Sequence, residues 1–328
     1  MKILVTGGGG FLGGAICRQL LQQGDQVAAY QRSASDALQS AGVQVIRGDI
    51  TDAGKLTEVT RGMDAVIHTA AKAGLSLSYE DYYLPNVTGT ENVIHACHAN
   101  GISKLVFTSS PSVTHADGDI EGGDESLPYP ESYNSPYPET KALAERQVMA
   151  ANCEELRTVS LRPHLVWGPG DNHLLPKLME RAKGGKLKLP GPEKLIDTVY
   201  IDNAAKAHLL ALAKLESDPE IVGGKTYFIS NDEPVTQECI IGGLLNAAGI
   251  DVDIQPISPR IAMVAGTFAE TTWKMFGLKS EPPITRWSAE HLSTAHWYDI
   301  SAAKRDLGYT AEVSIAEGLK ILSEQFSA

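Results

Sequence analysis

A strand pattern, a glycine-rich turn and a helix pattern follow one another in KILVTGGGGFLGGAICRQLLQQG, residues 2–24. KILVT is short, apolar and bounded by glycine, which is typical of a buried strand. The apolar side chains after the turn recur at helical spacing until Gly24, where a helix is expected to end. The glycines therefore lie in a tight turn between a strand and a helix.

Strand and helix patterns continue to alternate through the first half of the chain. Strands are expected in QVAAYQR, VQVIRGD, DAVIHTAA, KLVFTSS and RTVSLRP, with helices between them. Such alternation predicts an α/β fold with a doubly wound parallel sheet. After Pro163 the pattern loosens, although KTYFIS is expected to return as a last strand of the sheet. We expect a principal domain over 1–165, joined by segments near 195–232, and a small substrate lobe over 166–328.

Gly7, Gly10 and Gly13 have the spacing G-x-x-G-x-x-G within the turn. Glycine permits a tight reversal, lets backbone N–H groups approach a pyrophosphate, and allows close packing of helix on strand. A plain glycine-rich turn is the alternative. Because a strand precedes the turn and a helix follows it, the context favours nucleotide binding.

The end of the second strand bears on the choice of nucleotide. A site that prefers NAD places an acidic residue there to bind the ribose 2′-hydroxyl. This chain has Gln31 followed by Arg32, and a guanidinium would pair with a 2′-phosphate. The sequence therefore predicts NADP(H), with a solvated surface arginine as the alternative.

Tyr137 and Lys141 are four residues apart in a predicted helix, so their side chains share one face. A neighbouring ammonium favours the phenolate, and we therefore expect Lys141 to lower the pKa of Tyr137. Such a pair is also common on exposed helices. Ser109 and Ser110, however, end a predicted sheet strand, at the edge where open α/β sheets bind ligands. Together these residues indicate acid–base chemistry on a carbonyl group.

Composition excludes several other classes of function. The chain has 328 residues and a formal net charge of −12 without a basic cluster, which argues against nucleic acid as a partner. It contains no apolar run of about 18 residues that would span a membrane. Its four cysteines are scattered, and Met1 leads directly into a strand pattern, so we expect a cytoplasmic protein.

The chain resembles the extended short-chain dehydrogenase/reductases. The resemblance rests on TGGGGFLG, GDITD, HTAA, NVTGTENV, FTSS, YPETK and LRPHLVWGPGD, which occur in that order. It implies a Rossmann-type sheet, with Tyr137 as acid/base, Lys141 lowering its pKa and holding the nicotinamide ribose, and Ser110 or Ser109 orienting the carbonyl. Ser110 is favoured because the family's catalytic residue usually closes the serine run.

The same resemblance implies a set of cofactor-binding residues. Besides Tyr137 and Lys141, the set is Gly7, Gly10, Phe11, Leu12, Gly13, Arg32, Asp49, Ile50, Ala70, Ala71 and Pro163. Asp49 and Ile50 would flank the adenine, Ala70 and Ala71 would line the cofactor, and the backbone after Pro163 would meet the nicotinamide carboxamide.

The second half of the chain resembles the 3β-hydroxysteroid dehydrogenase-like branch, and the whole is most similar to bacterial reductases of 2-alkyl-3-oxoalkanoic acids in long-chain olefin biosynthesis. The implied reaction is NADPH-dependent reduction of the 3-keto group to a 3-hydroxy acid. A steroid or sterol 3β-hydroxy dehydrogenase, a nucleotide-sugar epimerase or dehydratase, and a nonenzymatic NADP sensor are the alternatives. We expect a small-molecule ligand, namely a large apolar keto acid, and a homo-oligomer, which could associate with other enzymes of the pathway.

An apolar stripe and six histidines have no role in the predicted reaction. An apolar stripe at helical spacing would either pack on the core or cover a long alkyl chain, a membrane or a partner, and Trp273, Trp287 and Trp297 could line the same region. The stripe is Ile261, Val264, Phe268, Thr272, Met275 and Phe276. The histidines follow no metal-binding spacing, so no metal is predicted. They are expected to be structural or polar lining: His68, His164, His173, His208, His291 and His296. His164 is the exception among them, because it follows Pro163 near the expected nicotinamide.

Overall fold

The computed structural model describes residues 1–115, 117–278 and 280–327. Its centre is a seven-stranded sheet in the order β12-β7-β5-β4-β1-β2-β3, and each adjacent pair of strands is parallel. The strands are β1 (Lys2–Thr6), β2 (Gln26–Gln31), β3 (Gln44–Arg47), β4 (Ala65–His68), β5 (Lys104–Thr108), β7 (Arg157–Pro163) and β12 (Lys225–Ile229). The predicted doubly wound sheet is confirmed, including the strand that returns late in the chain.

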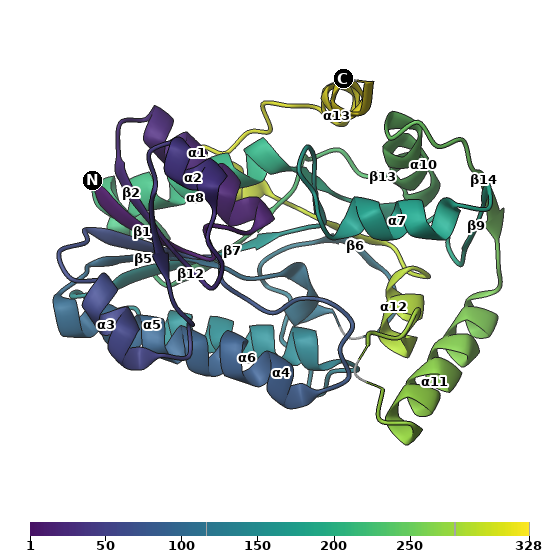
Figure 1. The fold of residues 1–328 in the computed structure, drawn as a ribbon, viewed down its shortest axis with the longest axis horizontal. Helices are drawn as coiled ribbons and strands as arrows, with labels where there is room; N and C mark the ends of the chain where they lie inside the picture. The colour runs from purple at the N-terminus through teal and green to yellow at the C-terminus, as the bar shows by residue number, and fades with distance from the viewer. Residues whose placement is uncertain (116, 279, 328) are drawn as a thin grey trace.

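Helices cover both faces of this sheet (Figure 1). One face carries α1 (Phe11–Gln22) and α8 (Ile201–Ser217), and the other carries α3 (Ala53–Val59), α5 (Gly89–Asn100) and α6 (Pro136–Ala150). Alternate strand residues explain the two layers, because Ile3 and Val5 pack in one core while Leu4 packs in the other. Strands buried on both faces require the nearly continuous apolar runs seen in the sequence.

The rest of the chain forms short elements beside the sheet. In the first half these are α2 (Asp36–Ser40), α4 (Tyr79–Tyr83), the π-helical turn Leu84–Thr88, the 3₁₀ turn Pro111–Thr114 and β6 (Ile120–Gly123). They continue with β8 (Val166–Trp167), α7 (Leu174–Ala182), β9 (Lys186–Leu189), β10 (Leu195–Ile196), β11 (Val199–Tyr200), α9 (Pro219–Val222) and β13 (Val235–Thr236). The last are α10 (Gln237–Ala247), β14 (Asp253–Pro256), α11 (Pro259–Met275), α12 (Arg286–His291), β15 (His296–Tyr298), the π-helical turn Ala303–Leu307 and α13 (Ile315–Ser327).

A second sheet joins segments that are distant in the sequence, in the order β13-β10-β15-β6. Strand β6 precedes α6, whereas β15 lies near the end of the chain, and the two pair in parallel. Figure 1 shows α7, α10, α11 and α12 gathered to one side of the central sheet, next to this smaller sheet. The C-terminal segments are therefore tied to the region that follows β5.

A buried ion pair fixes α6 against the central sheet. Glu145 of α6 and Arg162 of β7 are almost fully buried, and Arg162 Nη2 lies 2.6 Å from Glu145 Oε1. Tyr129 and Ser160 also donate hydrogen bonds to the same carboxylate, at 2.6 and 2.9 Å. Tyr137, Lys141 and Glu145 follow each other at four-residue spacing, so this anchor sets how the face that carries them is turned.

Removal of the Glu145 charge should destabilise the fold strongly, because Arg162 would stay buried without a counter-ion. We expect Glu145→Gln to lower the free energy of unfolding by about 3–5 kcal/mol, measured by urea denaturation. Glu154→Gln, at an exposed position, is the control and should change it by less than about 0.5 kcal/mol. Equal effects of the two substitutions would show that the ion pair does not anchor α6.

Candidate active site

The glycine turn brings three strand ends together. Gly7 has φ +73°, the left-handed region that favours glycine, and its N–H donates to the Tyr30 carbonyl at 2.8 Å. A Cβ at Gly7 would lie 2.8 Å from the Ala70 backbone, and one at Gly13 would lie 2.3 Å from the Gly7 carbonyl oxygen. Side chains are therefore excluded from both positions, and the backbone of the turn stays bare at the N-terminus of α1, where Phe11 and Leu12 begin the helix.

Two arginines meet beyond the ends of β2 and β3. Gln31 lies over the turn, where a Cβ on Gly9 would come within 2.6 Å of its amide. Arg32 follows it and is exposed, and Arg47 Nε donates to the Arg32 carbonyl at 3.4 Å. Arg47 was not singled out from the sequence. Arg47 is the β3 residue that pairs with Gln31 of β2. An alignment of the two predicted strands in parallel would have indicated that Arg47 lies beside Gln31 and Arg32.

Other predicted cofactor residues lie at the same edge of the sheet. Asp49 follows β3, and its carbonyl accepts a hydrogen bond from the Tyr30 hydroxyl at 2.8 Å. Hydrogen bonds from Thr51, together with the nearby Arg32 charge, lower the pKa of Asp49 despite partial desolvation. Ile50 is buried, Ala70 and Ala71 follow β4, and Pro163 ends β7. These positions surround the strand ends that the glycine turn joins.

The catalytic candidates meet where β5 and α6 approach each other. The hydroxyls of Ser110 and Ser112 share a hydrogen bond of 2.9 Å. A hydrogen bond between the side chains of Ser110 and Tyr137 favours the ionised form of Tyr137. Ser109 points elsewhere, since its hydroxyl is buried and lies beside the Glu145 carboxylate. Ser110, the serine that the resemblance favoured, is therefore the one beside Tyr137.

The protonation of Tyr137 and Lys141 is governed by burial. Lys141 donates to the Thr108 carbonyl at 2.7 Å and lies 4.2 Å from the centre of the Phe107 ring. Burial lowers the pKa of Lys141 to about 7, with the Glu145 carboxylate acting in the opposite direction. The expected lowering of the Tyr137 pKa is wrong for this structure. Burial raises the pKa of Tyr137, and the Ser110 hydrogen bond opposes this only in part.

Aromatic side chains surround the Tyr137 ring. The centre of the Tyr82 ring lies 6.1 Å away, and that of Trp287 from α12 lies 6.5 Å away. A small pocket beside them is lined by Pro136, Lys274 and Trp287, among others. The start of α6 and the C-terminal helices α11 and α12 thus share one pocket, which begins next to the candidate acid/base.

The apolar stripe on α11 does not pack on the core. Ile261 is 65% exposed, Val264 70% and Phe268 73%, and Met275 and Phe276 are similarly exposed. Core packing, one of the two alternatives left open for this stripe, is therefore excluded, because α11 rests on α12 through small residues such as Gly266 and turns this face outward. Of the tryptophans, Trp287 and α11 share the pocket near Tyr137, whereas Trp297 packs over Gly122 in β6.

Two of the remaining histidines are structural, as expected. His68 is buried between the hydroxyls of Thr6 and Thr90, at 2.7 and 3.0 Å, and burial lowers its pKa to about 3. His208 of α8 bonds to the Thr108 hydroxyl at 2.8 Å, and burial lowers its pKa to about 4. These neutral imidazoles complete hydrogen bonds beneath the strand ends. His173 is exposed.

Comparison with known proteins places this architecture in a family. The profile of the 3-beta hydroxysteroid dehydrogenase/isomerase family matches residues 4–256. The chain is 49% identical to the 2-alkyl-3-oxoalkanoate reductase of Stenotrophomonas maltophilia, with 100% of both chains covered. It is 44% identical to the protein of the same name from Shewanella oneidensis, over 97% of this chain and 84% of that one.

A solved structure has the same fold throughout. The UDP-glucose 4-epimerase of Thermus thermophilus, in complex with NAD, superposes with a TM-score of 0.75 at 25% identity, covering 100% of this chain and 99% of that one. Across the described residues, none of the helices has both the length and the apolar character needed to cross a bilayer. The chain belongs to the 3-beta hydroxysteroid dehydrogenase/isomerase family and is an oxidoreductase of the extended short-chain dehydrogenase/reductase type, acting on a hydroxyl or keto group.

Proposed function

We propose that the protein reduces the 3-keto group of a long-chain 2-alkyl-3-oxoalkanoic acid to the 3-hydroxy acid, with NADPH as the donor. The observation that carries the proposal is the placement of Ser110, Tyr137 and Lys141 at the carboxyl edge of the sheet, beside the bare glycine turn. The two relatives with 49% and 44% identity bear the name of this activity.

A nicotinamide cofactor fits the residues at this edge. Cβ atoms at Gly7 and Gly13 would fill the cradle at the start of α1, and the solved relative with this fold contains NAD. Arg32 and Arg47 would hold a 2′-phosphate, since no acidic side chain occupies position 31. Asp49 and Ile50 would flank the adenine, and Ala70, Ala71 and Pro163 would line the path to the nicotinamide. When bound, the cofactor would supply the hydride.

The chain's own residues would manage the proton. The raised pKa of Tyr137 keeps its hydroxyl protonated near neutral pH, as a proton donor requires. Ser110 would hold the ketone oxygen within reach of that hydroxyl. Negative charge develops on this oxygen, and donors already in place stabilise it without reorganisation. Lys141 would hold the nicotinamide ribose, and its charge would stabilise the tyrosinate once the proton has left.

The C-terminal helices favour an apolar substrate. A shallow groove along α11 is lined by the exposed side chains of Val264 and Phe268, and Arg260 and Arg286 also contribute to its lining. An alkyl chain would cover the apolar side chains, and a carboxylate would suit the arginines. A sterol substrate is the second candidate, because the fission-yeast sterol-4-alpha-carboxylate 3-dehydrogenase is 34% identical over 98% of this chain. A cytoplasmic location, a homo-oligomer and association with pathway enzymes stay predictions.

Removal of the Tyr137 hydroxyl should disable proton transfer and leave cofactor binding intact. We expect Tyr137→Phe to lower kcat at least about 10²-fold, the usual contribution of general acid–base catalysis, with little change in the Kd of NADPH. Steady-state NADPH oxidation and fluorescence titration measure the two quantities. Tyr79→Phe, which removes an exposed hydroxyl, is the control. Undiminished turnover by Tyr137→Phe would remove this residue from the mechanism.

Loss of the Arg32 guanidinium should weaken the binding of NADPH but not that of NADH. We expect Arg32→Ala to weaken NADPH binding by roughly 1.5–3 kcal/mol, the contribution of a hydrogen bond to a charged group, while NADH binding barely changes. Calorimetric titration with both cofactors measures the difference. Arg61→Ala, at another exposed arginine, should change neither affinity. Equal losses for NADPH and NADH in Arg32→Ala would place the 2′-phosphate elsewhere.

The substrate class is tested with 2-alkyl-3-oxo acids of increasing length, beside a 3-ketosteroid and a nucleotide sugar. We expect kcat/KM to rise with chain length, each buried CH₂ contributing up to about 0.8 kcal/mol until the groove is full. Phe268→Asp should penalise long substrates more than short ones without lowering Tm, because Phe268 is 73% exposed. Phe326→Asp, on the exposed side of α13, is the matched control. A flat length profile in the wild type would exclude a long alkyl chain.

A further inference from the structure

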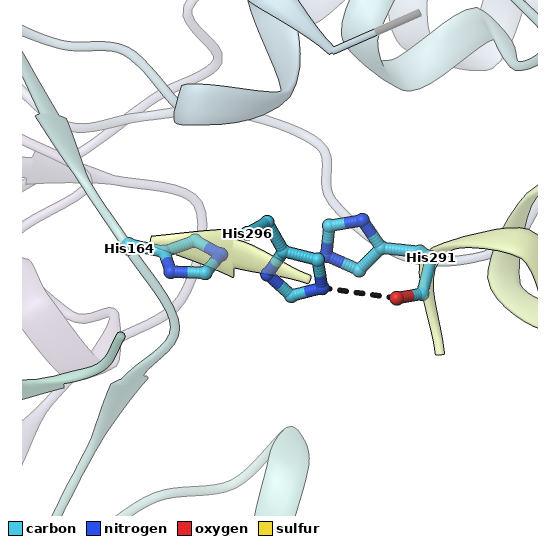
Figure 2. Close-up of side chains that lie close together, drawn as sticks. All are labelled: His164, His291 and His296. Carbon is cyan, nitrogen blue, oxygen red and sulfur yellow. Dashed lines mark hydrogen bonds between the residues drawn. The ribbon is translucent and has the colours of Figure 1, made fainter. Parts of the chain in front are cut away.

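Three histidines from distant parts of the chain meet between the two sheets. His164 follows β7, His291 ends α12 and His296 begins β15 (Figure 2). Each offers a ring nitrogen, and these three atoms lie within 4.8 Å of one another. His164 and His296 are 5% and 3% exposed, and the His291 and His296 rings stack with their centres 3.9 Å apart. His291 is partly exposed as a residue, although its Nδ1 atom is buried.

Several ring nitrogens in this cluster lack partners. Both nitrogens of His164, and Nδ1 of His291 and of His296, are buried without a hydrogen bond to any described residue. Buried polar groups are nearly always paired in native proteins, because an unpaired one has lost its water without replacement. A group that accepts lone pairs from several directions at once would satisfy all three imidazoles.

The surroundings orient the rings as metal ligands are usually oriented. A ligating histidine typically donates its second N–H to a carboxylate or a backbone carbonyl. His296 Nε2 donates to the His291 carbonyl at 2.9 Å, which leaves the lone pair on Nδ1 (Figure 2). His164 Nδ1 lies 4.0 Å from Asp197 Oδ1, an oxygen that is itself buried and unpartnered among the described residues. Donation to Asp197 would leave Nε2 of His164 free.

The hydrogen bonds around the cluster favour a cation over an anion as its occupant. A metal ion binds the lone pair of a neutral imidazole, whereas an anion needs N–H donors from the rings. His296 already donates its Nε2 proton to the His291 carbonyl, so its Nδ1 offers a lone pair. The Asp197 carboxylate, 1% exposed, also favours a positive charge nearby.

We propose that His164, His291 and His296 bind one divalent metal ion of the zinc class, with Asp197 orienting His164. Three histidines with a fourth position for water or a carboxylate form a common zinc donor set. Zinc–nitrogen bonds are about 2.0–2.1 Å long, so the stacked rings must turn toward a common centre when the ion binds.

Metal binding would restrict the movement of elements that border the active site. The ion would tie α12 and β15, which are neighbours in the sequence, to the distant segment after β7. Trp287 stacks on His291 at 5.3 Å and also contacts the edge of the Tyr137 ring. Metal binding would therefore fix the wall of the substrate pocket, and the three histidines are positioning residues that do not touch the reacting atoms.

The test is titration of the tag-free protein with Zn²⁺, followed by calorimetry. A second titration uses Co²⁺, whose visible absorption reports nitrogen ligation in a tetrahedral site. We expect one saturable site in the wild type. Its loss is expected in His164→Ala and His296→Ala, and a 10–100-fold weaker Kd in Asp197→Asn, the usual effect of removing an orienting partner. His95→Ala, at an exposed histidine of α5, should bind as the wild type does.

Thermal unfolding keeps the proposal falsifiable if an alanine variant folds poorly. Zn²⁺ should raise the Tm of the wild type and of His95→Ala, and should raise that of Asp197→Asn less at the same concentration. The proposal is overturned if the wild type shows no saturable site, or if the same site survives in His164→Ala and Asp197→Asn. Decanoate serves as the probe for the rival occupant, a carboxylate. The proposal is also overturned if the wild type binds decanoate but no metal, and His296→Ala loses decanoate binding. None of these readouts requires turnover, so they stand apart from the proposed reductase activity.

Discussion

The buried pair of Glu145 and Arg162 is the contact on which the arrangement of the site depends. It joins α6 to β7 within the core, and the Tyr129 and Ser160 hydroxyls complete the coordination of the carboxylate. Lys141 and Tyr137 lie about one and two turns before Glu145, respectively, on the same face of α6. Rotation of α6 would separate the two charges and leave each of them buried without a counter-ion. Both functional side chains therefore stay directed at the strand ends.

The parallel sheet explains why residues from so many segments meet. Every strand of the central sheet ends at the same edge, and the glycine turn, Arg32, Asp49, Ala70, Ser110 and Pro163 all follow such ends. Brought to this edge, Lys141 loses water and its pKa falls to about 7, while burial raises that of Tyr137. The same desolvation that shapes the pocket thus prepares a protonated tyrosine beside a lysine of altered pKa.

Predictions from the sequence succeeded where a local pattern reports a local structure. The glycine spacing, the apolar runs and the i,i+4 pair located the turn, the strands and the face of α6, and the returning strand β12 was also found. They failed, or left alternatives open, where the surroundings of a side chain decide. The direction of the Tyr137 pKa shift and the place of Trp297 were predicted wrongly, and the sequence left open whether the α11 stripe is buried or exposed. All three depend on what packs against each side chain, which spacing along the chain does not contain.

The sequence by itself determined the doubly wound sheet and the positions of its strand ends, because both follow from the periodicity of nearby residues. Only the tertiary structure decided that Ser110 rather than Ser109 faces Tyr137, that Arg47 joins Arg32, and that His164 meets His291 and His296. His164 lies more than a hundred positions before His291 and His296, and residues so far apart carry no periodic signal of their proximity. Their meeting follows from the pairing of β15 with β6 and from the packing of α12 beside the site.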